Sequence, residues 1–236
     1  MRMPPIEKEE DRLREVVRGR IQHVPQDLYS MSNLGQLFML QERERRVLNL
    51  LRKNNSEVIS AGRILEVGCG TGLWIRDLIR WGADPGHITG IELLQERALE
   101  AQRLCPAGVS VHCGNAATLV FPDHAFDLVI QSTVFTSILN REVRQELARE
   151  MLRVLKPEGF ILWYDFHMNN PWNADVRGVT SHEIRTLFPR CQVQLSRITL
   201  APPLVRILAP VSWMACHLLS LVPFLCTHYL GIIRKL

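Results

Sequence analysis

Lysine is scarce in this chain of 236 residues, which carries 4 Lys beside 24 Arg and 24 acidic residues. The arginines are interleaved with glutamates, and a net charge of +4 without a basic block is not the pattern of a nucleic-acid-binding protein. We therefore expect no nucleic-acid partner. In the densest run, from Arg43 to Arg46, the glutamates Glu42 and Glu44 offset the charge, which predicts a solvated helix face.

Cysteine pairs with metal-binding or redox spacing are also missing. The six cysteines form no C-x-x-C pair, and no His lies at zinc-finger spacing from them. This predicts no metal site and a reduced, cytoplasmic compartment. A secretory signal is not expected, because the segment from Glu7 to Arg20 is rich in charge where a signal peptide would be apolar. No Ser/Gly/Pro-rich linker interrupts the chain, so we expect a single domain over 1–236.

One long stretch lacks charge: from Ile207 to Ile233 there is no Asp, Glu, Lys or Arg. Pro210 and Pro223 divide it, and the residues between them would form about 18 Å of helix, against roughly 30 Å of bilayer hydrocarbon. We therefore expect no transmembrane span. The insert at 201–226 carries an apolar stripe that includes Val211, Met214 and Leu218. Three roles stay open for it: a cover for the sheet, a lid with a greasy inner face, or a peripheral contact with a membrane surface.

The chain does contain a regular alternation of short apolar segments and amphipathic ones. Strands are expected at 64–67, 88–92, 109–113, 126–131, 160–166, 192–200 and 228–234. Helices are expected at 34–53, 73–79, 95–104, 142–155 and 183–188. The pattern predicts an α/β fold: a Rossmann-like, doubly wound sheet of seven mostly parallel strands, with helices on both faces and an antiparallel last strand.

A glycine-rich turn, Glu66 to Gly72, stands where the first strand meets the next helix, and Glu92 ends the second strand. Such positions meet at the carboxyl edge of a doubly wound sheet, where ligands bind. A dinucleotide fingerprint needs a later third glycine, and position 73 is Leu. No G-K-[ST] follows, which excludes a Walker loop. Glu66 would repel a pyrophosphate but could receive an ammonium group, and Glu92 suits a ribose diol.

Five segments in this order resemble the class I S-adenosylmethionine-dependent methyltransferases, particularly the small-molecule branch related to quinone biosynthesis. They are E-V-G-C-G-T-G from Glu66, G-I-E from Gly90, G-N-A from Gly114, F-D-L-V-I from Phe126 and R-V-L-K-P-E-G from Arg153. The resemblance implies S-adenosyl-L-methionine as cofactor. It also implies an N-terminal helical cap at 1–55, a cofactor-binding core at 56–200, the insert at 201–226 and a last strand at 227–236.

The resemblance places the cofactor on particular residues. The methionine part would lie on the turn, with Glu66, Gly68, Cys69, Gly70, Thr71 and Gly72. Glu92 would take the ribose hydroxyls and Leu93 a face of the adenine, and Asn115 with Ala116 would meet the adenine edge. Gln131 and Ser132 would lie near the sulfonium. Asn115 stands where the family usually has Asp, although an amide oxygen can also accept from the adenine amine.

The acceptor is expected to be a small, apolar molecule methylated at oxygen. Asp165 and His167 lie at the end of the fifth strand, near the expected acceptor pocket, and are the candidate catalytic bases. C-methylation of a quinone-like acceptor stays open. A protein that binds S-adenosylmethionine without methylating, as a partner subunit or sensor, is the alternative from another functional class. The oligomeric state is left open.

Overall fold

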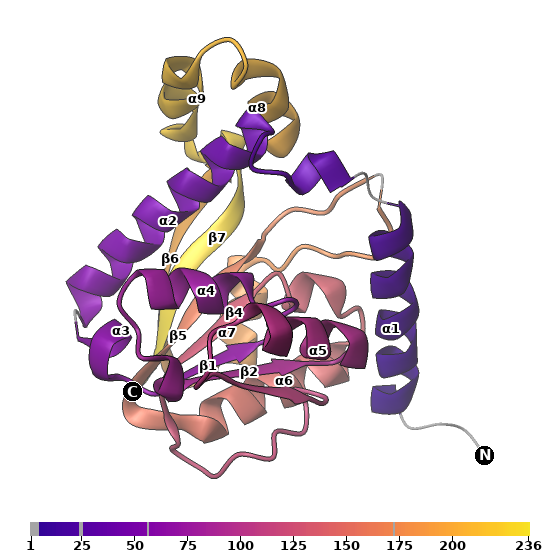
Figure 1. Ribbon diagram of the computed structural model, residues 1–236, viewed down its shortest axis with the longest axis vertical. Coiled ribbons are helices and arrows are strands. Elements are labelled where there is room, and N and C mark those ends of the chain that lie inside the picture. Colours follow the sequence, from indigo (N-terminus) through magenta and orange to yellow (C-terminus); the bar gives the residue numbers. More distant parts are fainter. Residues whose placement is uncertain (1–4, 24–25, 56, 172) are drawn as a thin grey trace.

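A seven-stranded sheet with the order β3-β2-β1-β4-β5-β7-β6 organises the computed structural model, which describes residues 5–23, 26–55, 57–171 and 173–236 (Figure 1). Neighbouring strands among β1 to β5 are parallel, whereas β7 is antiparallel to both β5 and β6. The predicted doubly wound sheet with an antiparallel last strand is confirmed. The strands are β1 Ile64–Val67, β2 Ile88–Glu92, β3 Ser110–Cys113, β4 Phe126–Ser132, β5 Leu155–Phe166, β6 Cys191–Leu200 and β7 Cys226–Lys235.

Helices connect and cover these strands, and several begin at a side-chain cap. Asn33, Asn140 and Thr180 accept backbone N–H bonds at the starts of α2, α6 and α7, which ends the extended chain there. The helices are α1 Pro5–His23, α2 Leu34–Asn54, α3 Val58–Ala61, α4 Leu73–Arg80, α5 Gln95–Leu104, α6 Arg141–Val154, α7 Ser181–Leu187, α8 Pro202–Leu208 and α9 Trp213–Ser220. The 3-10 turns are Gln26–Tyr29, Pro85–His87, Phe135–Ser137 and Pro223–Leu225.

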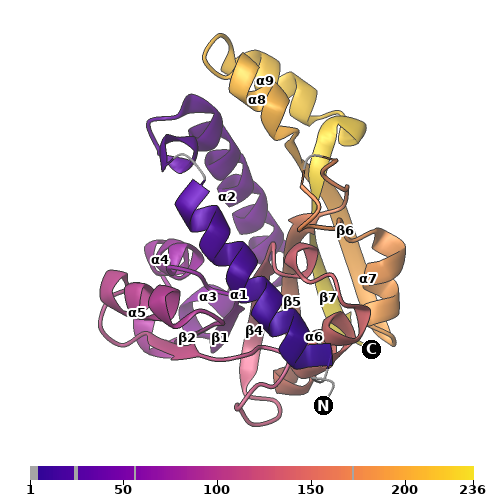
Figure 2. The ribbon, with the colours of Figure 1, turned by 90° about the vertical axis from the view of Figure 1, so that its right-hand side faces the viewer.

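Two apolar clusters hold the helices on opposite faces of the sheet. Because successive strand residues point to opposite faces, Leu65 and Val67 of β1 join Leu147 of α6 in one cluster. Ile64 of the same strand joins Leu78 of α4 in the other. Figure 2 shows α6 and α7 on one side of the sheet and α2, α4 and α5 on the other. The helices thereby bring the carboxyl ends of β1, β2 and β4 to one edge of the sheet.

Helices α8 and α9 form a hairpin that projects beyond the ends of β6 and β7, beside the start of α2 (Figures 1 and 2). We name residues 201–226 the α8–α9 tip. Its inner side packs Val205 and Cys216 against Phe38 of α2 in a third, small cluster. The stripe of Val211, Met214 and Leu218 is exposed instead. An apolar inner face formed by this stripe is therefore ruled out, because other residues of the tip, among them Trp213, pack on Phe38 of α2.

Within the described part of the chain, no helix is both long enough and apolar enough to cross a bilayer.

Arg144 ties α6 to the segment that follows β5. Its guanidinium is fully buried and donates to the carbonyl oxygens of Ile138 and Arg177 at 2.6 and 3.1 Å and to Glu183 Oε1 at 2.7 Å. A buried cation is tolerated only when it is paired and hydrogen-bonded in this way.

We expect Arg144→Met to lower the free energy of unfolding by about 3 kcal/mol, because two carbonyls and a carboxylate lose their donor. The matched control is Arg149→Met on the same helix, where the ion pair with Glu146 is exposed and the loss should stay below about 1 kcal/mol. Urea denaturation of the two variants measures the difference. Equal losses would contradict the structural role of Arg144.

Candidate functional site

The glycine-rich turn after β1 lies against the segment that follows β4. Gly68, Gly70 and Gly72 have φ of +66°, +58° and +78°, values that side chains disfavour. A Cβ atom on Gly68 would also lie 2.6 Å from Cγ2 of Val134, so the turn has no room for a side chain there. The close approach leaves the backbone of the turn open toward the edge of the sheet.

Glu92, at the end of β2, holds this turn in place. Its Oε2 accepts the Gly70 N–H at 2.8 Å and its Oε1 accepts the Leu94 N–H at 3.1 Å. Arg97 Nη1 lies 3.9 Å from the same carboxylate. Each oxygen keeps a further lone pair, and Glu92 lines the cavity described next. A carboxylate so placed can still accept hydrogen bonds from a ligand hydroxyl.

A cavity of about 850 Å³ opens at this edge, bounded by α1, α2, α6 and the ends of β1, β2 and β4. It brings together most of the residues predicted to bind the cofactor: Glu66, Gly68, Cys69, Gly70, Thr71, Glu92, Leu93, Asn115, Ala116 and Ser132. Gly72 and Gln131 do not line it. Gln131 is fully buried, and its Oε1 accepts the Val134 N–H at 3.3 Å, so this side chain shapes the segment after β4.

Arg43 reaches the same cavity from α2, and its burial corrects the prediction of a solvated helix face for this residue. Its guanidinium lies 4.5 Å from the centre of the Trp74 ring and 3.3 Å from Asp77 Oδ2. Arg43 precedes the buried Val47 and Leu51 by one and two helical turns. Residues at this spacing share one face of a helix, so the sequence does indicate that Arg43 faces inward. The charged residues on either side of Arg43 obscured this pattern.

Glu66 and Arg43 are buried ionisable residues that line one cavity, and each keeps a polar atom without a partner in the described part of the chain. Burial raises the pKa of Glu66 to about 8, while the positive charge of Arg43 acts in the opposite direction. Among the described residues, Glu66 Oε2 and Arg43 Nε have no hydrogen-bond partner. Both atoms are covered in this conformation, so a ligand carrying an ammonium and a carboxylate group would satisfy them after the side chains rotate toward the cavity.

Helix α1 covers the cavity with Ile6, Leu13 and Val17. Their spacing marks one helical face, which the charges of this segment concealed in the sequence. The helix is fixed by polar contacts: Asn115 Nδ2 donates to Glu10 Oε2 at 2.9 Å. The Asn115 Oδ1 accepts the Ala117 N–H at 2.8 Å, so the predicted adenine-edge amide is engaged on both sides.

The two predicted bases lie outside the cavity lining. Asp165 is fully buried and accepts from Thr136 N at 3.2 Å, from the Thr136 hydroxyl and from Phe166 N at 2.9 Å. Burial raises the pKa of Asp165 to about 7, and the bond from Thr136 opposes that shift. His167 is half-buried, with Nε2 2.8 Å from the Cys226 carbonyl oxygen. The structure therefore does not bring Asp165 and His167 together with the cofactor residues.

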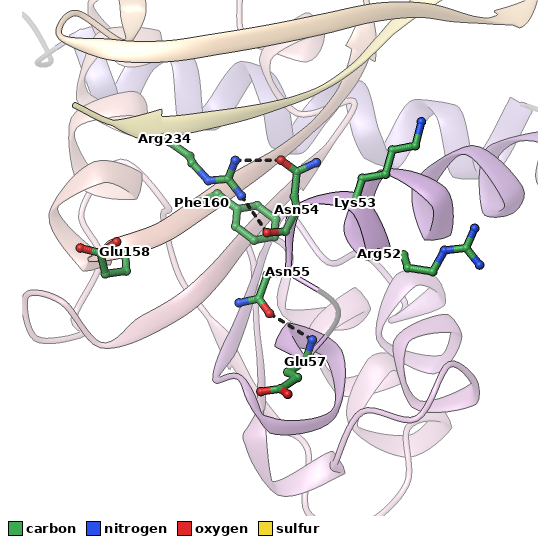
Figure 3. Close-up of a pocket in the computed structure, with 8 residues that line it drawn as sticks. All are labelled: Arg52, Lys53, Asn54, Asn55, Glu57, Glu158, Phe160 and Arg234. Atoms are coloured by element: carbon green, nitrogen blue, oxygen red, sulfur yellow. Dashed lines mark hydrogen bonds between the residues drawn. The ribbon is translucent and has the colours of Figure 1, made fainter.

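A second hollow, of about 630 Å³, lies near the amino end of β5 (Figure 3). Its lining is mainly charged or amide side chains, and Arg234 donates to Asn54 Oδ1 at 2.8 Å. None of the residues predicted to bind or react lies there. Because ligands of open α/β sheets bind beyond the carboxyl ends of the strands, we assign the functional site to the first cavity.

Comparison with known proteins finds similarity over the core of the chain. Residues 64–159 match a family described as "Methyltransferase domain". The tRNA N(3)-cytidine methyltransferase METTL2 of Gallus gallus is 32% identical over 112 residues, which are 44% of this chain and 30% of that protein. The demethylmenaquinone methyltransferase of Listeria monocytogenes serotype 4a is 33% identical over 112 residues, 45% of this chain and 46% of that protein.

A solved structure extends the similarity in fold. The S-adenosylmethionine-dependent methyltransferase from Mesorhizobium loti aligns with a TM-score of 0.58 at 17% identity, over 78% of this chain and 95% of that chain. The chain spans less than half the length of the two curated relatives.

We expect the free energy of unfolding to depend on pH through the titration of Glu66. Because the folded-state pKa of about 8 lies above the ordinary 4.5, the stabilisation is present below pH 4.5 and is lost as pH rises through 8. The substituted side chain in Glu66→Gln does not titrate. As pH rises from 4.5 to about 8, the free energy of unfolding of this variant should therefore increase relative to that of the wild type, by at most about 1.4 kcal/mol per pH unit. Urea denaturation across this range tests it, and a difference independent of pH would refute the assignment.

Proposed function

Because residues 64–159 belong to the methyltransferase domain family, we propose that the chain is an S-adenosylmethionine-dependent methyltransferase acting on a small, apolar molecule. For this segment, the methyltransferase family indicated by five sequence motifs is confirmed, as is the Rossmann-like fold predicted from the alternation of strands and helices. S-adenosylmethionine is the methyl donor of the class I enzymes that these motifs resemble. The activity of the whole chain, its acceptor and its partners are our proposals.

The observation that carries the proposal is the pair of spare buried groups on the cavity wall. Once its side chain rotates toward the cavity, Glu66 can accept from an ammonium group through Oε2, and Arg43 can donate to a carboxylate, which together match the amino-acid end of the cofactor. Glu92 keeps lone pairs for the ribose hydroxyls. A cavity of about 850 Å³ is within the usual range for sites of small ligands and cofactors.

When bound, the sulfonium supplies an electrophilic methyl group, whose in-line transfer disperses positive charge. The residues of this chain would bind the donor, orient it and exclude water. Helix α1 supports the last role, because Ile6, Leu13 and Val17 cover the cavity and Glu10 fixes the helix to Asn115. Apolar side chains of α6, Val143 and Leu147, also line it. This lining favours an apolar acceptor.

We propose oxygen as the methylated atom, with Asp165 and His167 as candidate bases. Either side chain would have to move to reach an acceptor in the cavity, since Asp165 is held by Thr136 and His167 by the Cys226 carbonyl. An acceptor with an acidic phenol or enol would need no base. C-methylation of a quinone-like acceptor is the alternative that the similarity to the demethylmenaquinone methyltransferase supports.

The similarity to a tRNA methyltransferase raises nucleic acid as a second acceptor class. Many arginines exposed to solvent are ion-paired, as in Arg18 with Glu96, Arg80 with Glu44 and Arg149 with Glu146. The cavity lining carries Glu10 and Glu100 beside Arg43 and Arg97, so it offers no excess of positive charge to a phosphate backbone. These charges favour a small molecule.

Calorimetric titration with S-adenosylmethionine, S-adenosylhomocysteine and NAD is the first experiment. We expect micromolar binding of the first two and none of NAD, because the turn lacks the later third glycine of a dinucleotide fingerprint and has Leu at position 73. Absence of binding by all three would overturn the proposal. Binding without product in an acceptor screen would support the sensor or partner alternative.

Glu92→Gln should weaken binding of S-adenosylhomocysteine by about tenfold or more, because a neutral amide is a poorer acceptor for the ribose hydroxyls than a buried carboxylate. Glu100→Gln, at an exposed residue that also lines the cavity, is the matched control and should change affinity less than about threefold. Thermal melting of both variants separates loss of binding from loss of the turn that Glu92 holds. Unchanged affinity in a folded Glu92→Gln protein would disprove the ribose assignment.

Arg43→Gln should weaken binding of S-adenosylhomocysteine about tenfold or more, since a charged hydrogen bond to the ligand carboxylate is lost. Binding of 5′-methylthioadenosine, which lacks the amino-acid end, should be unaffected. Arg45→Gln, two residues along α2 and exposed, is the control. Equal weakening of the two ligands would show that Arg43 acts on the cavity's shape rather than on the carboxylate.

The two candidate bases are tested by methyl transfer to a panel of phenols, enols and hydroquinones. If Asp165 or His167 removes the acceptor proton, Asp165→Asn or His167→Ala should lower kcat by about 100-fold or more while cofactor affinity is retained. Nuclear magnetic resonance of the product distinguishes an O-methyl from a C-methyl group. Unchanged kcat in both variants would exclude either residue as a base.

A further inference from the structure

The α8–α9 tip exposes large apolar side chains that no other element covers. Six of them are between 59% and 83% exposed: Ile207, Val211, Met214, Leu218, Leu221 and Phe224. They extend over α8, α9 and the 3-10 turn Pro223–Leu225. Exposed apolar side chains gathered on one element mark an interaction site more often than scattered ones do.

The same end of the molecule carries more positive than negative charge at its surface. Residues 201–227 contain no Asp or Glu, and Arg206 of α8 is exposed. Arg45 of α2 lies 3.5 Å from His217 of α9, and Arg197 is exposed on β6. Within the described part of the chain none of these three guanidinium groups is ion-paired with a carboxylate. Two acids lie at this end: Asp27, exposed on the 3-10 turn Gln26–Tyr29 that precedes α2, and Glu42 of α2, which is buried beneath the tip near Arg45 and Cys216.

The tip is convex and small. Figures 1 and 2 show it projecting from one end of the molecule, away from the sheet and its covering helices. Its two helices are each about 10 to 12 Å long, so a contact between two tips would bury on the order of a few hundred Å², less than the roughly 800 Å² per partner of a stable dimer. The apolar side chains project separately and are surrounded by basic residues. This arrangement favours binding to a deformable, anionic surface.

We propose that the α8–α9 tip docks this protein on the surface of a lipid bilayer with anionic headgroups, inserting its apolar side chains while Arg45, Arg197 and Arg206 face the headgroups. The apolar surface continues onto the start of α2, where Met31 and Leu34 are exposed and Gly35 lies against Arg206. Tyr29, exposed on the preceding turn, also lines the main cavity. Docking would therefore turn one rim of that cavity toward the lipid.

Flotation with vesicles of phosphatidylcholine, alone and with phosphatidylglycerol added, tests the proposal on the full chain. The wild type should float with the anionic vesicles, and Met214→Glu/Leu218→Glu should lower the partition coefficient about tenfold or more. The matched control is Leu99→Glu/Val120→Glu, which makes the same change at exposed apolar positions elsewhere. It should stay within about twofold of the wild type. Arg45→Gln/Arg206→Gln should remove the preference for anionic over neutral vesicles.

Three results would overturn the proposal: no flotation of the wild type, equal losses in the tip and control variants, or a dimer in light scattering that the tip variant abolishes. Thermal melting verifies that each variant is folded. Titration of the tip variant with S-adenosylhomocysteine should match the wild type. Docking and cofactor binding can thus fail separately, and the inference does not depend on methyl transfer.

Discussion

The carboxylate of Glu92 is the interaction on which the functional site depends. It accepts the N–H groups of Gly70 and Leu94, and so joins the turn after β1 to the start of the segment after β2. Parallel strands alone would align these two ends without fixing the conformation of the turn between them. Gly68 packs so closely against Val134 that no side chain fits between them. This contact fixes the position of the turn, and the turn shapes the cavity.

An acidic and a basic residue both line that cavity. Glu66 and Arg43 come from a strand end and from α2, and each retains an unpaired polar atom among the described residues. Buried ionisable groups with an unpaired polar atom cost stability. Such groups are common at sites that bind a ligand. Asp165 is also buried, but its oxygens accept bonds from Thr136 and Phe166. Its observed contacts organise the segment after β4 rather than the cavity wall.

Apolar surface is divided between two places with different environments. Helix α1 turns Ile6, Leu13 and Val17 inward over the cavity, whereas the α8–α9 tip turns its large side chains outward. The tip can do so because a different set of its residues, Val205, Cys216 and Trp213, packs on Phe38. The insert, for which the sequence left open a cover, a lid or a membrane contact, is a projection in the folded chain, and the cover over the cavity comes from the opposite end of the sequence.

By itself the sequence determined the order and type of most secondary-structure elements, because strand and helix periodicities and capping residues such as Asn140 act over a few residues. It also placed Glu66, Glu92 and Asn115 at strand ends, where a doubly wound sheet brings them together. Only the tertiary structure decided that Arg43 is buried, that α1 covers the cavity, and that the stripe of the tip faces outward. These properties depend on which neighbour each helix packs against. When a helix has charged residues on its inward face, or apolar residues on both faces, its own sequence does not show which face will be buried.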